Sequence, residues 1–140
     1  MIEDEAEQPP WRAAKLDGFM GLIGPLQTRR IDGGKYYGLQ TDARHRNGIG
    51  TVHGGVVTSL LDQVIALETW NAAGRQPTAT VQMDTRFLGA AHAGDFLEAT
   101  ATIRRMTGSL AFVDAQVSRG DDILATATAI MKILKQQGKT

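Results

Sequence analysis

Residues 47–70 read NGIGTVHGGVVTSLLDQVIALETW, and the rest of the chain is organised around this stretch. A glycine-broken loop passes through His53, Gly54 and Gly55 and continues into a helical pattern with the acid Asp62 midway along it. At about a hundred degrees per residue, apolar side chains fill about half of the helix surface. This predicted core face consists of Val56, Val57, Leu60, Leu61, Val64, Ile65 and Leu67. The polar half consists of Thr58, Ser59, Asp62, Gln63 and Thr69.

The chain has 140 residues, enough for one ordinary domain with its own core. Its 15 basic residues balance its 15 acidic ones, so no net charge attracts nucleic acid or an anionic membrane. Cysteine is absent, which excludes disulfides, a thiol nucleophile and thiolate metal sites. The start of the chain, MIEDEAEQPPW, has no features of a signal peptide, so we expect a cytoplasmic protein. We expect a single domain over residues 11–134 and disordered tails over 1–10 and 135–140.

Short elements are predicted before the central helix. Residues 11–20 place apolar side chains on one broad face, which predicts a short amphipathic helix. Residues 22–30 and 35–42 are predicted as the strands of a hairpin, because Asp-Gly-Gly at 32–34 tolerates the positive φ of a tight turn. Residues 43–52 are polar, basic and broken by glycine, which indicates a functional loop rather than a regular element.

Four strands are predicted after the helix, which should end near Gly74. Residues 78–87 change to a period of two, and further alternating runs cover 97–104, 111–118 and 123–134. Because short turns join these runs, we expect an antiparallel meander. The fold class is therefore α+β, with a curved antiparallel sheet of about six strands wrapped around one long central helix. In the first run, one face is predicted to hold Ala79, Val81, Met83, Thr85 and Phe87, and the other Thr78, Thr80, Gln82, Asp84 and Arg86.

Two features of the helix suggest chemistry. Glycines at a helix start leave backbone N–H groups uncovered at the positive end of the helix dipole, so the Gly54 N–H suits a carbonyl that gains negative charge. Asp62 is either a solvated acid on a polar face or a functional carboxylate. The two residues are eight positions apart, which is about 12 Å along a helix. If they cooperate, Asp62 must come from a second, antiparallel copy of the helix across a homodimer interface.

A motif extends over the loop, the helix and the following strand and consists of Asn47, His53, Gly54, Gly55, Asp62 and Thr80. In this motif, and in the order of elements from about residue 20 to residue 134, the chain resembles the hotdog-fold acyl-CoA thioesterases of the phenylacetate-degradation (PaaI-like) group. The resemblance implies hydrolysis of an acyl-CoA thioester, in which the Gly54 N–H polarises the carbonyl. It implies that Asp62 of the partner subunit activates water or attacks the carbonyl itself.

The resemblance also implies the remaining roles. Asn47 would hold water or substrate, His53 would shape the turn and could also contact the thioester end, and Thr80 would bind water beside Asp62. The groups expected to contact the substrate or the phosphates of coenzyme A are Gly55, Arg86, His92, Arg104, Arg105, Thr107, Gly108 and Ser109. Basic residues of this kind are more often ordinary solvated surface residues. No cofactor is expected beyond the coenzyme A of the substrate. The expected partners are this acyl-CoA substrate and a homodimer mate, with dimers pairing into a tetramer.

Other kinds of site find less support. The three histidines suit no common zinc pattern, no GxSxG elbow occurs, and the glycines match neither a P-loop nor a dinucleotide fingerprint. Two alternatives stay open: a hydratase or dehydratase acting on 3-hydroxyacyl thioesters, and a non-catalytic acyl-CoA binding protein on the same scaffold. The acyl group also stays open, because residues 22–25, Tyr36, Tyr37, Trp70 and Phe87 suit a substrate pocket and core packing equally well.

Overall fold

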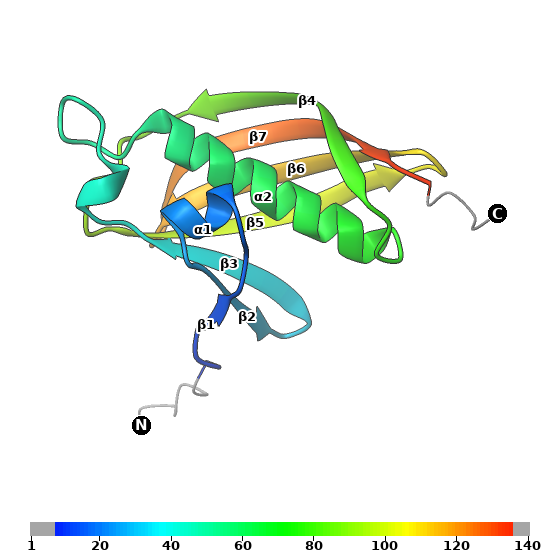
Figure 1. Cartoon of the computed structure of the whole chain (residues 1–140), viewed down its shortest axis with the longest axis horizontal. Coiled ribbons are helices and arrows are strands. Elements are labelled where there is room, and N and C mark those ends of the chain that lie inside the picture. Colours follow the sequence, from blue (N-terminus) through cyan, green and yellow to red (C-terminus); the bar gives the residue numbers. More distant parts are fainter. Residues whose placement is uncertain (1–7, 136–140) are drawn as a thin grey trace.

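The computed structural model describes residues 8–135, and Figure 1 shows one long helix lying across a seven-stranded sheet. The tails predicted at the two ends fall largely outside the described residues, which exclude 1–7 and 136–140. None of the helices in the described part is long and apolar enough to cross a membrane. In chain order the elements are β1 (Arg12–Ala14), α1 (Phe19–Ile23), β2 (Leu26–Ile31), β3 (Gly34–Gln40), a 3-10 turn (Ala43–His45), α2 (Gly54–Ala72), β4 (Thr78–Phe87), β5 (Phe96–Met106), β6 (Leu110–Arg119) and β7 (Asp122–Ile133).

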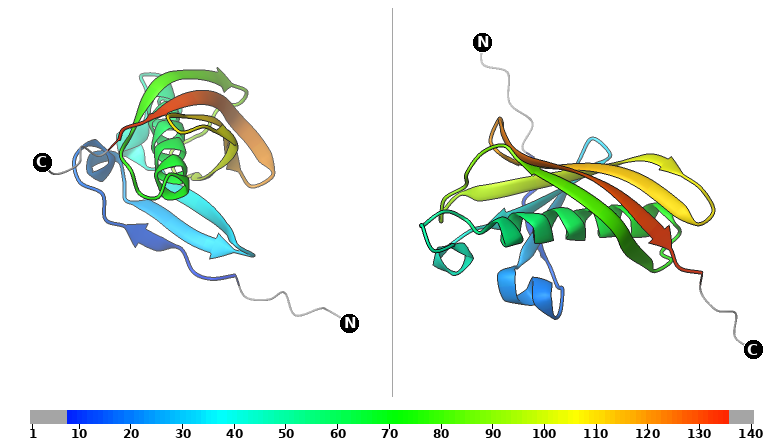
Figure 2. Two further views of the ribbon diagram at one scale, coloured as in Figure 1. Left: turned by 90° about the vertical axis from the view of Figure 1, so that its right-hand side faces the viewer. Right: turned by 90° about the horizontal axis from the view of Figure 1, so that it is seen from above.

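The sheet is antiparallel throughout and has the strand order β1-β2-β3-β5-β6-β7-β4. The predicted curved antiparallel sheet around one helix is confirmed, and the left view of Figure 2 shows the sheet curling around α2. The predicted four-strand meander is only partly right. Strands β5, β6 and β7 follow one another, but β4 pairs with β7 at the far edge. Both edges of β5 are already occupied by β3 and β6, so the segment 88–95 must cross the end of the sheet.

The N-terminal region differs from the helix predicted over residues 11–20. Residues 12–14 instead form β1, which pairs with β2 and adds a seventh strand. Trp11 packs against Phe96 with ring centroids 5.1 Å apart and lies 4.3 Å from the Arg29 guanidinium carbon. Gly38 makes room for this packing, because a Cβ there would collide with the Phe96 ring. These contacts over long sequence distances outweigh the local helical pattern, and only residues 19–23 become helical.

The predicted core face of α2 is confirmed, with one correction. Val56, Val57, Leu60, Leu61, Val64 and Ile65 are buried, while Leu67 is partly buried against the same core. Thr69 was predicted on the polar half but is fully buried. Its hydroxyl donates to the Ile65 carbonyl at 2.7 Å within the helix, so burial leaves no unpaired polar group. The helix ends at Ala72, and Gly74 follows with φ of 68°, as expected of a C-terminal stop.

The hairpin between β2 and β3 also follows the prediction. Asp32 and Gly33 adopt φ of 50° and 79°, which is the left-handed region that a two-residue turn between antiparallel strands requires. Its strands begin and end within a few residues of the predicted bounds, at Leu26–Ile31 and Gly34–Gln40. In Figure 1 this hairpin lies below α2, and Tyr37 on β3 hydrogen-bonds to Glu68 on the helix.

Candidate active site

The start of α2 leaves one backbone donor without a partner. His53 is the N-cap, and its Nδ1 accepts the Gly55 N–H at 2.7 Å. The N–H groups of Val56 and Val57 donate to the His53 carbonyl. Within residues 8–135, the Gly54 N–H has no acceptor. This N–H lies at the positive end of a 19-residue helix, where an oxygen gaining negative charge is stabilised.

Asn47 closes the loop in front of the helix. Its Oδ1 accepts the N–H groups of Ile49 at 3.0 Å and Thr51 at 3.1 Å, and its Nδ2 donates to the Thr51 hydroxyl at 2.7 Å. The backbone N–H of Asn47 donates to the Thr51 carbonyl at 2.7 Å. An amide nitrogen carries two hydrogens, so one Nδ2 hydrogen is left for a water or substrate. Asn47 is thus chiefly a loop-forming residue, with a single free donor for the role predicted for it.

Side chains from the end of β4 and the segment after it gather at the same place. The Phe87 ring lies 3.5 Å from the position that a Cβ on Gly54 would occupy. Phe87 is 56% exposed despite its size, and Leu88 beside it is 61% exposed. His92 pairs with Thr51 as an isolated bridge, so it stands beside the loop that leads into α2. The Gly54 end of the helix therefore has exposed apolar side chains beside it, and the backbone of His92 lies next to the loop that precedes it.

An ion pair holds the segment that carries His92. Asp95 accepts the His92 N–H at 2.9 Å and an Arg119 N–H at 2.9 Å. The His92 N–H and the Arg119 guanidinium hold the pKa of Asp95 below its usual value. The Val52 N–H donates to the Ala91 carbonyl at 2.8 Å, which ties the same segment to the approach to α2. The start of α2 is thus fixed by two loops that are far apart in the sequence.

The middle of α2 carries the second part of the motif. The Thr80 hydroxyl donates to Asp62 Oδ1 at 2.7 Å, which leaves Asp62 Oδ2 without a donor in the described residues. Asp62 is half-buried and projects from the part of α2 that the apolar core does not cover. A carboxylate with one oxygen fixed and the other open is suited to accept a proton or to attack a carbonyl.

A β-bulge makes the contact between Thr80 and Asp62. The regular alternation predicted for β4 placed Ala79 and Val81 on the same face as Met83, and Thr80 on the other face, and this prediction is wrong. The register shifts between Thr80 and Gln82, so that Thr80 lies opposite the buried Met131. Val81 is 59% exposed as a result. Beyond the bulge Met83, Thr85 and Phe87 lie opposite buried alanines, as predicted.

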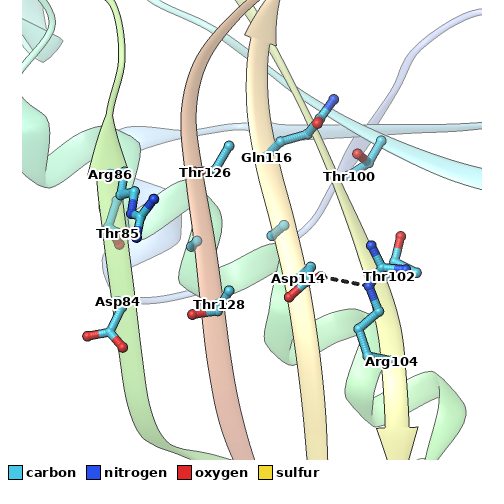
Figure 3. Close-up of a pocket in the computed structure, with 12 residues that line it drawn as sticks. Asp84, Thr85, Arg86, Thr100, Thr102, Arg104, Asp114, Gln116, Thr126 and Thr128 are labelled. Carbon is cyan, nitrogen blue, oxygen red and sulfur yellow. Dashed lines mark hydrogen bonds and ion pairs between the residues drawn. The ribbon is translucent and has the colours of Figure 1, made fainter.

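Several of the residues predicted to bind coenzyme A lie away from Gly54 of the same chain. Arg104 donates to Asp114 at 2.6 Å, and with Arg86 it lines a cavity of about 750 Å³ on the sheet face opposite α2 (Figure 3). The turn of Thr107, Gly108 and Ser109 joins β5 to β6 at the end of the sheet away from Gly54 of the same chain (Figure 1). Arg105 is exposed near that turn. A single chain therefore does not bring these groups together with Gly54.

Two further residues, Tyr37 and His45, are hydrogen-bonded to α2 or to its N-cap. Tyr37 is fully buried and donates to Glu68 on α2 at 2.7 Å, and burial followed by this hydrogen bond raises the pKa of Tyr37 far above its usual range. Tyr37 is therefore a core residue and not part of an open pocket. His45 is also buried, and its carbonyl accepts the His53 N–H at 2.7 Å. The sequence offers no periodic signal for His45, because it lies in an irregular polar loop.

Comparisons with known proteins show which family the chain belongs to. The profile of the thioesterase superfamily matches residues 49–126. The chain belongs to the thioesterase superfamily. A relative in Pseudomonas aeruginosa, "Putative esterase PA0474", is 29% identical over 131 residues, which cover 92% of this chain and 96% of the relative. Human acyl-coenzyme A thioesterase 13 is 25% identical over 80 residues, which cover 57% of each chain.

Solved structures show the same architecture. The PaaI protein of the E. coli phenylacetic acid degradation operon superimposes with a TM-score of 0.74 at 19% identity, over 86% of this chain and 87% of that one. This thioesterase-superfamily chain therefore has the hotdog fold, as its motif and element order predicted. The superfamily match covers α2 and the strands β4, β5 and β6, so it includes both Gly54 and Asp62.

Proposed function

We propose that this member of the thioesterase superfamily hydrolyses acyl-CoA thioesters to a free acid and coenzyme A, at two equivalent sites across a homodimer interface. The observation that carries the proposal is the pair of half-sites on α2. The Gly54 N–H, which has no acceptor within residues 8–135, is at its start. The Asp62 carboxylate, held by Thr80, is at its middle. The acyl-CoA thioesterase named among the relatives supports this substrate class.

Each half-site has a distinct chemical task. The Gly54 N–H donates to the thioester oxygen, which gains negative charge as the carbonyl carbon becomes tetrahedral. Asp62 of the partner subunit acts through Oδ2, since Oδ1 is occupied by Thr80. Either it takes a proton from water while the water oxygen bonds to the carbonyl carbon, or it forms that bond itself and water then cleaves the resulting anhydride. In both routes the C–S bond breaks and coenzyme A leaves as a thiolate that is then protonated.

Helix geometry supports the dimer. Gly54, Thr58 and Asp62 are spaced by four residues, so they form one stripe along α2. If Gly54 of one copy meets Asp62 of the other, the two-fold axis passes near Thr58, midway between them. Strand β4 flanks this stripe and lies at the edge of the sheet, with Val81 exposed. The free backbone groups of an edge strand can pair with those of β4 in a second copy of the chain. Dimers of this kind would pair further into tetramers.

The antiparallel arrangement also brings the remaining predicted ligands into reach. The turn at Thr107, Gly108 and Ser109 lies at the end of α2 farthest from its own Gly54, and therefore toward the Gly54 end of the partner. With Arg105 this turn is the stronger candidate for the phosphates of coenzyme A, because Arg104 is neutralised by Asp114. His92 and Gly55 lie beside the thioester end of the site. The protein needs no cofactor beyond the coenzyme A of its substrate.

The hydratase alternative requires a histidine that removes a proton beside the carbonyl. His53 is unsuited to this task, because its Nδ1 already accepts the Gly55 N–H and its proton therefore sits on Nε2. A non-catalytic acyl-CoA binding protein would use the same cleft but would not depend on the Asp62 carboxylate.

The test is a screen of aromatic and aliphatic acyl-CoA thioesters for release of free thiol. For Asp62→Asn and Asp62→Ala we expect turnover to fall by about a thousandfold with an intact dimer, since general-base groups contribute about 10²–10⁴. Asp121→Asn, an exposed acid in the turn between β6 and β7, is the matched control and should keep full activity. Unchanged turnover in the Asp62 variants would exclude this mechanism, whereas a wild-type protein that binds acyl-CoA but releases no thiol would favour a binding protein.

A further inference from the structure

The loop between β3 and α2 is hydrogen-bonded to the end of α1 through two adjacent side chains. Arg44 donates to the carbonyls of Leu22 at 2.8 Å and Gly24 at 2.9 Å. His45 Nε2 lies 2.6 Å from the carbonyl of Ile23, the residue between them. Three successive carbonyls therefore bind to two successive loop residues, although about twenty positions separate the two segments.

Hydrogen bonding defines the chemical state of His45. Its Nδ1 is 2.9 Å from the Asp42 N–H, which is only a donor, so Nδ1 is an acceptor without a proton. The Ile23 carbonyl is only an acceptor, so Nε2 carries the proton and donates. The ring is 1% exposed. Both ring nitrogens are thus occupied, and His45 has no free group with which to bind substrate.

The backbone of His45 connects this loop to the start of α2. The His45 carbonyl accepts the His53 N–H at 2.7 Å, and His53 in turn caps the Gly55 N–H. Gly54 lies between His53 and Gly55, and these hydrogen bonds fix its peptide plane from both sides. The bond from Asp42 N–H to the imidazole closes the 3-10 turn that points the His45 carbonyl toward His53. A loss of this bond would let the carbonyl, and with it the Gly54 N–H, rotate.

We propose that His45 is a positioning residue for hydrolysis, whose imidazole fixes the turn of residues 42–46 and thereby aims the Gly54 N–H at the thioester oxygen. This inference rests on the proposed function for its effect on rate. The effect on the backbone at the start of α2 does not depend on any reaction. Hydrolysis should therefore slow at saturating substrate without a matching loss of substrate affinity.

Three variants separate positioning from simple stability. His45→Ala removes both imidazole bonds. His45→Asn removes the ring and the bond to Ile23 but places its Oδ1 where Nδ1 stood, so the Asp42 N–H keeps an acceptor. Arg44→Ala removes the bonds to Leu22 and Gly24 and the ion pair with the Asp42 carboxylate. It leaves the two bonds that the inference depends on, from the Asp42 N–H to the imidazole and from the His53 N–H to the His45 carbonyl, because neither involves the Arg44 side chain.

We expect His45→Ala to lower kcat by about tenfold, because a displacement of about 1 Å at the reacting atoms costs up to about a hundredfold. His45→Asn should recover to within about threefold of wild type, and Arg44→Ala should stay within about twofold, with KM nearly constant in all three. Thermal unfolding is measured beside the kinetics. The proposal is overturned if His45→Asn is as slow as His45→Ala, or if kcat simply follows the melting temperature across the variants.

Amide hydrogen exchange tests the same inference without substrate. The His53 and Gly55 amides should exchange faster in His45→Ala than in wild type and recover in His45→Asn. Arg44→Ala should leave these two amides close to wild type and change exchange only in the α1 segment and around Asp42, which the Arg44 side chain contacts. Unchanged exchange at His53 and Gly55 in His45→Ala contradicts the inference. A wild-type protein that releases no thiol from any acyl-CoA would instead contradict the proposed function, and the exchange result would still decide the role of His45.

Discussion

The two ends of the proposed site on α2 are built in different ways. At the helix start, the working group is a backbone N–H, and its position depends on two loops, a histidine cap and an arginine-aspartate pair. At the helix middle, the working group is the Asp62 side chain, and one hydrogen bond from Thr80 holds it. The first half-site should therefore be sensitive to backbone changes over a wide region. The second should be sensitive to single atoms of two side chains.

A substitution at Gly55 should have the largest effect on the half-site at the start of α2. A Cβ on Gly55 would lie 2.9 Å from His53 Nδ1, so the ring must move and the cap must break. The same Cβ on Gly54 meets only Phe87 at 3.5 Å, which is ordinary contact. We expect Gly55→Ala to lower kcat by about a hundredfold and Gly54→Ala by no more than about threefold. Equal kinetics for the two variants would show that the cap does not position the N–H.

Substitutions at Thr80 test the half-site at the middle of α2, where this residue holds Asp62. Thr80→Val keeps the shape but removes the donor to Asp62, and a hydrogen bond to a charged group contributes about 1.5–3 kcal/mol. We expect kcat to fall by about tenfold at least in Thr80→Val, and Thr80→Ser to stay close to wild type. Steady-state kinetics of the two variants decide the point. If both variants match wild type, Asp62 needs no partner on β4.

The ion pair of Asp95 and Arg119 predicts a smaller, pH-dependent effect confined to the helix start. The pKa of Asp95 is lowered in the folded protein. Its contribution to stability is therefore present above the pKa of the unfolded chain, about 3.9, and is lost as pH falls through the lower folded value. Urea unfolding should show that Asp95→Asn is less stable than wild type at pH 7 and that the difference shrinks toward about pH 3. A difference that persists or grows in acid would contradict this assignment, and Asp121→Asn should show none.

The parts of the fold that local patterns encode could be predicted from the sequence. The apolar arc of α2 and the Asp32-Gly33 turn depend on neighbours within a few positions, and both are confirmed. Strand β1 and the place of β4 beside β7 depend on pairing between distant segments, which alternation alone does not specify. Thr69 is buried because its hydroxyl bonds within its own helix, which removes the usual cost of burying a polar group.

In the candidate site too, some features follow from local sequence patterns and others depend on contacts between distant segments. The N–H of Gly54 and the acid on the next turns of the helix follow from one continuous stretch of sequence. The bulge that turns Thr80 toward Asp62 interrupts a regular alternation, and nothing in residues 78–87 marks it. Only the resemblance placed Thr80 beside Asp62. His45 was missed because its partners, Ile23 and His53, come together only in the folded chain.

The claim that Gly54 and Asp62 act across two subunits is tested most directly by complementation. Asp62→Ala and Gly54→Pro chains are co-expressed with different tags, and dimers carrying both tags are purified. Proline is tolerated at a first helical position but has no N–H, so each variant alone should be inactive. A mixed dimer has one site with both groups intact, so it should show about half of the wild-type activity per dimer. Mixed dimers that form and remain inactive would contradict a site shared between subunits.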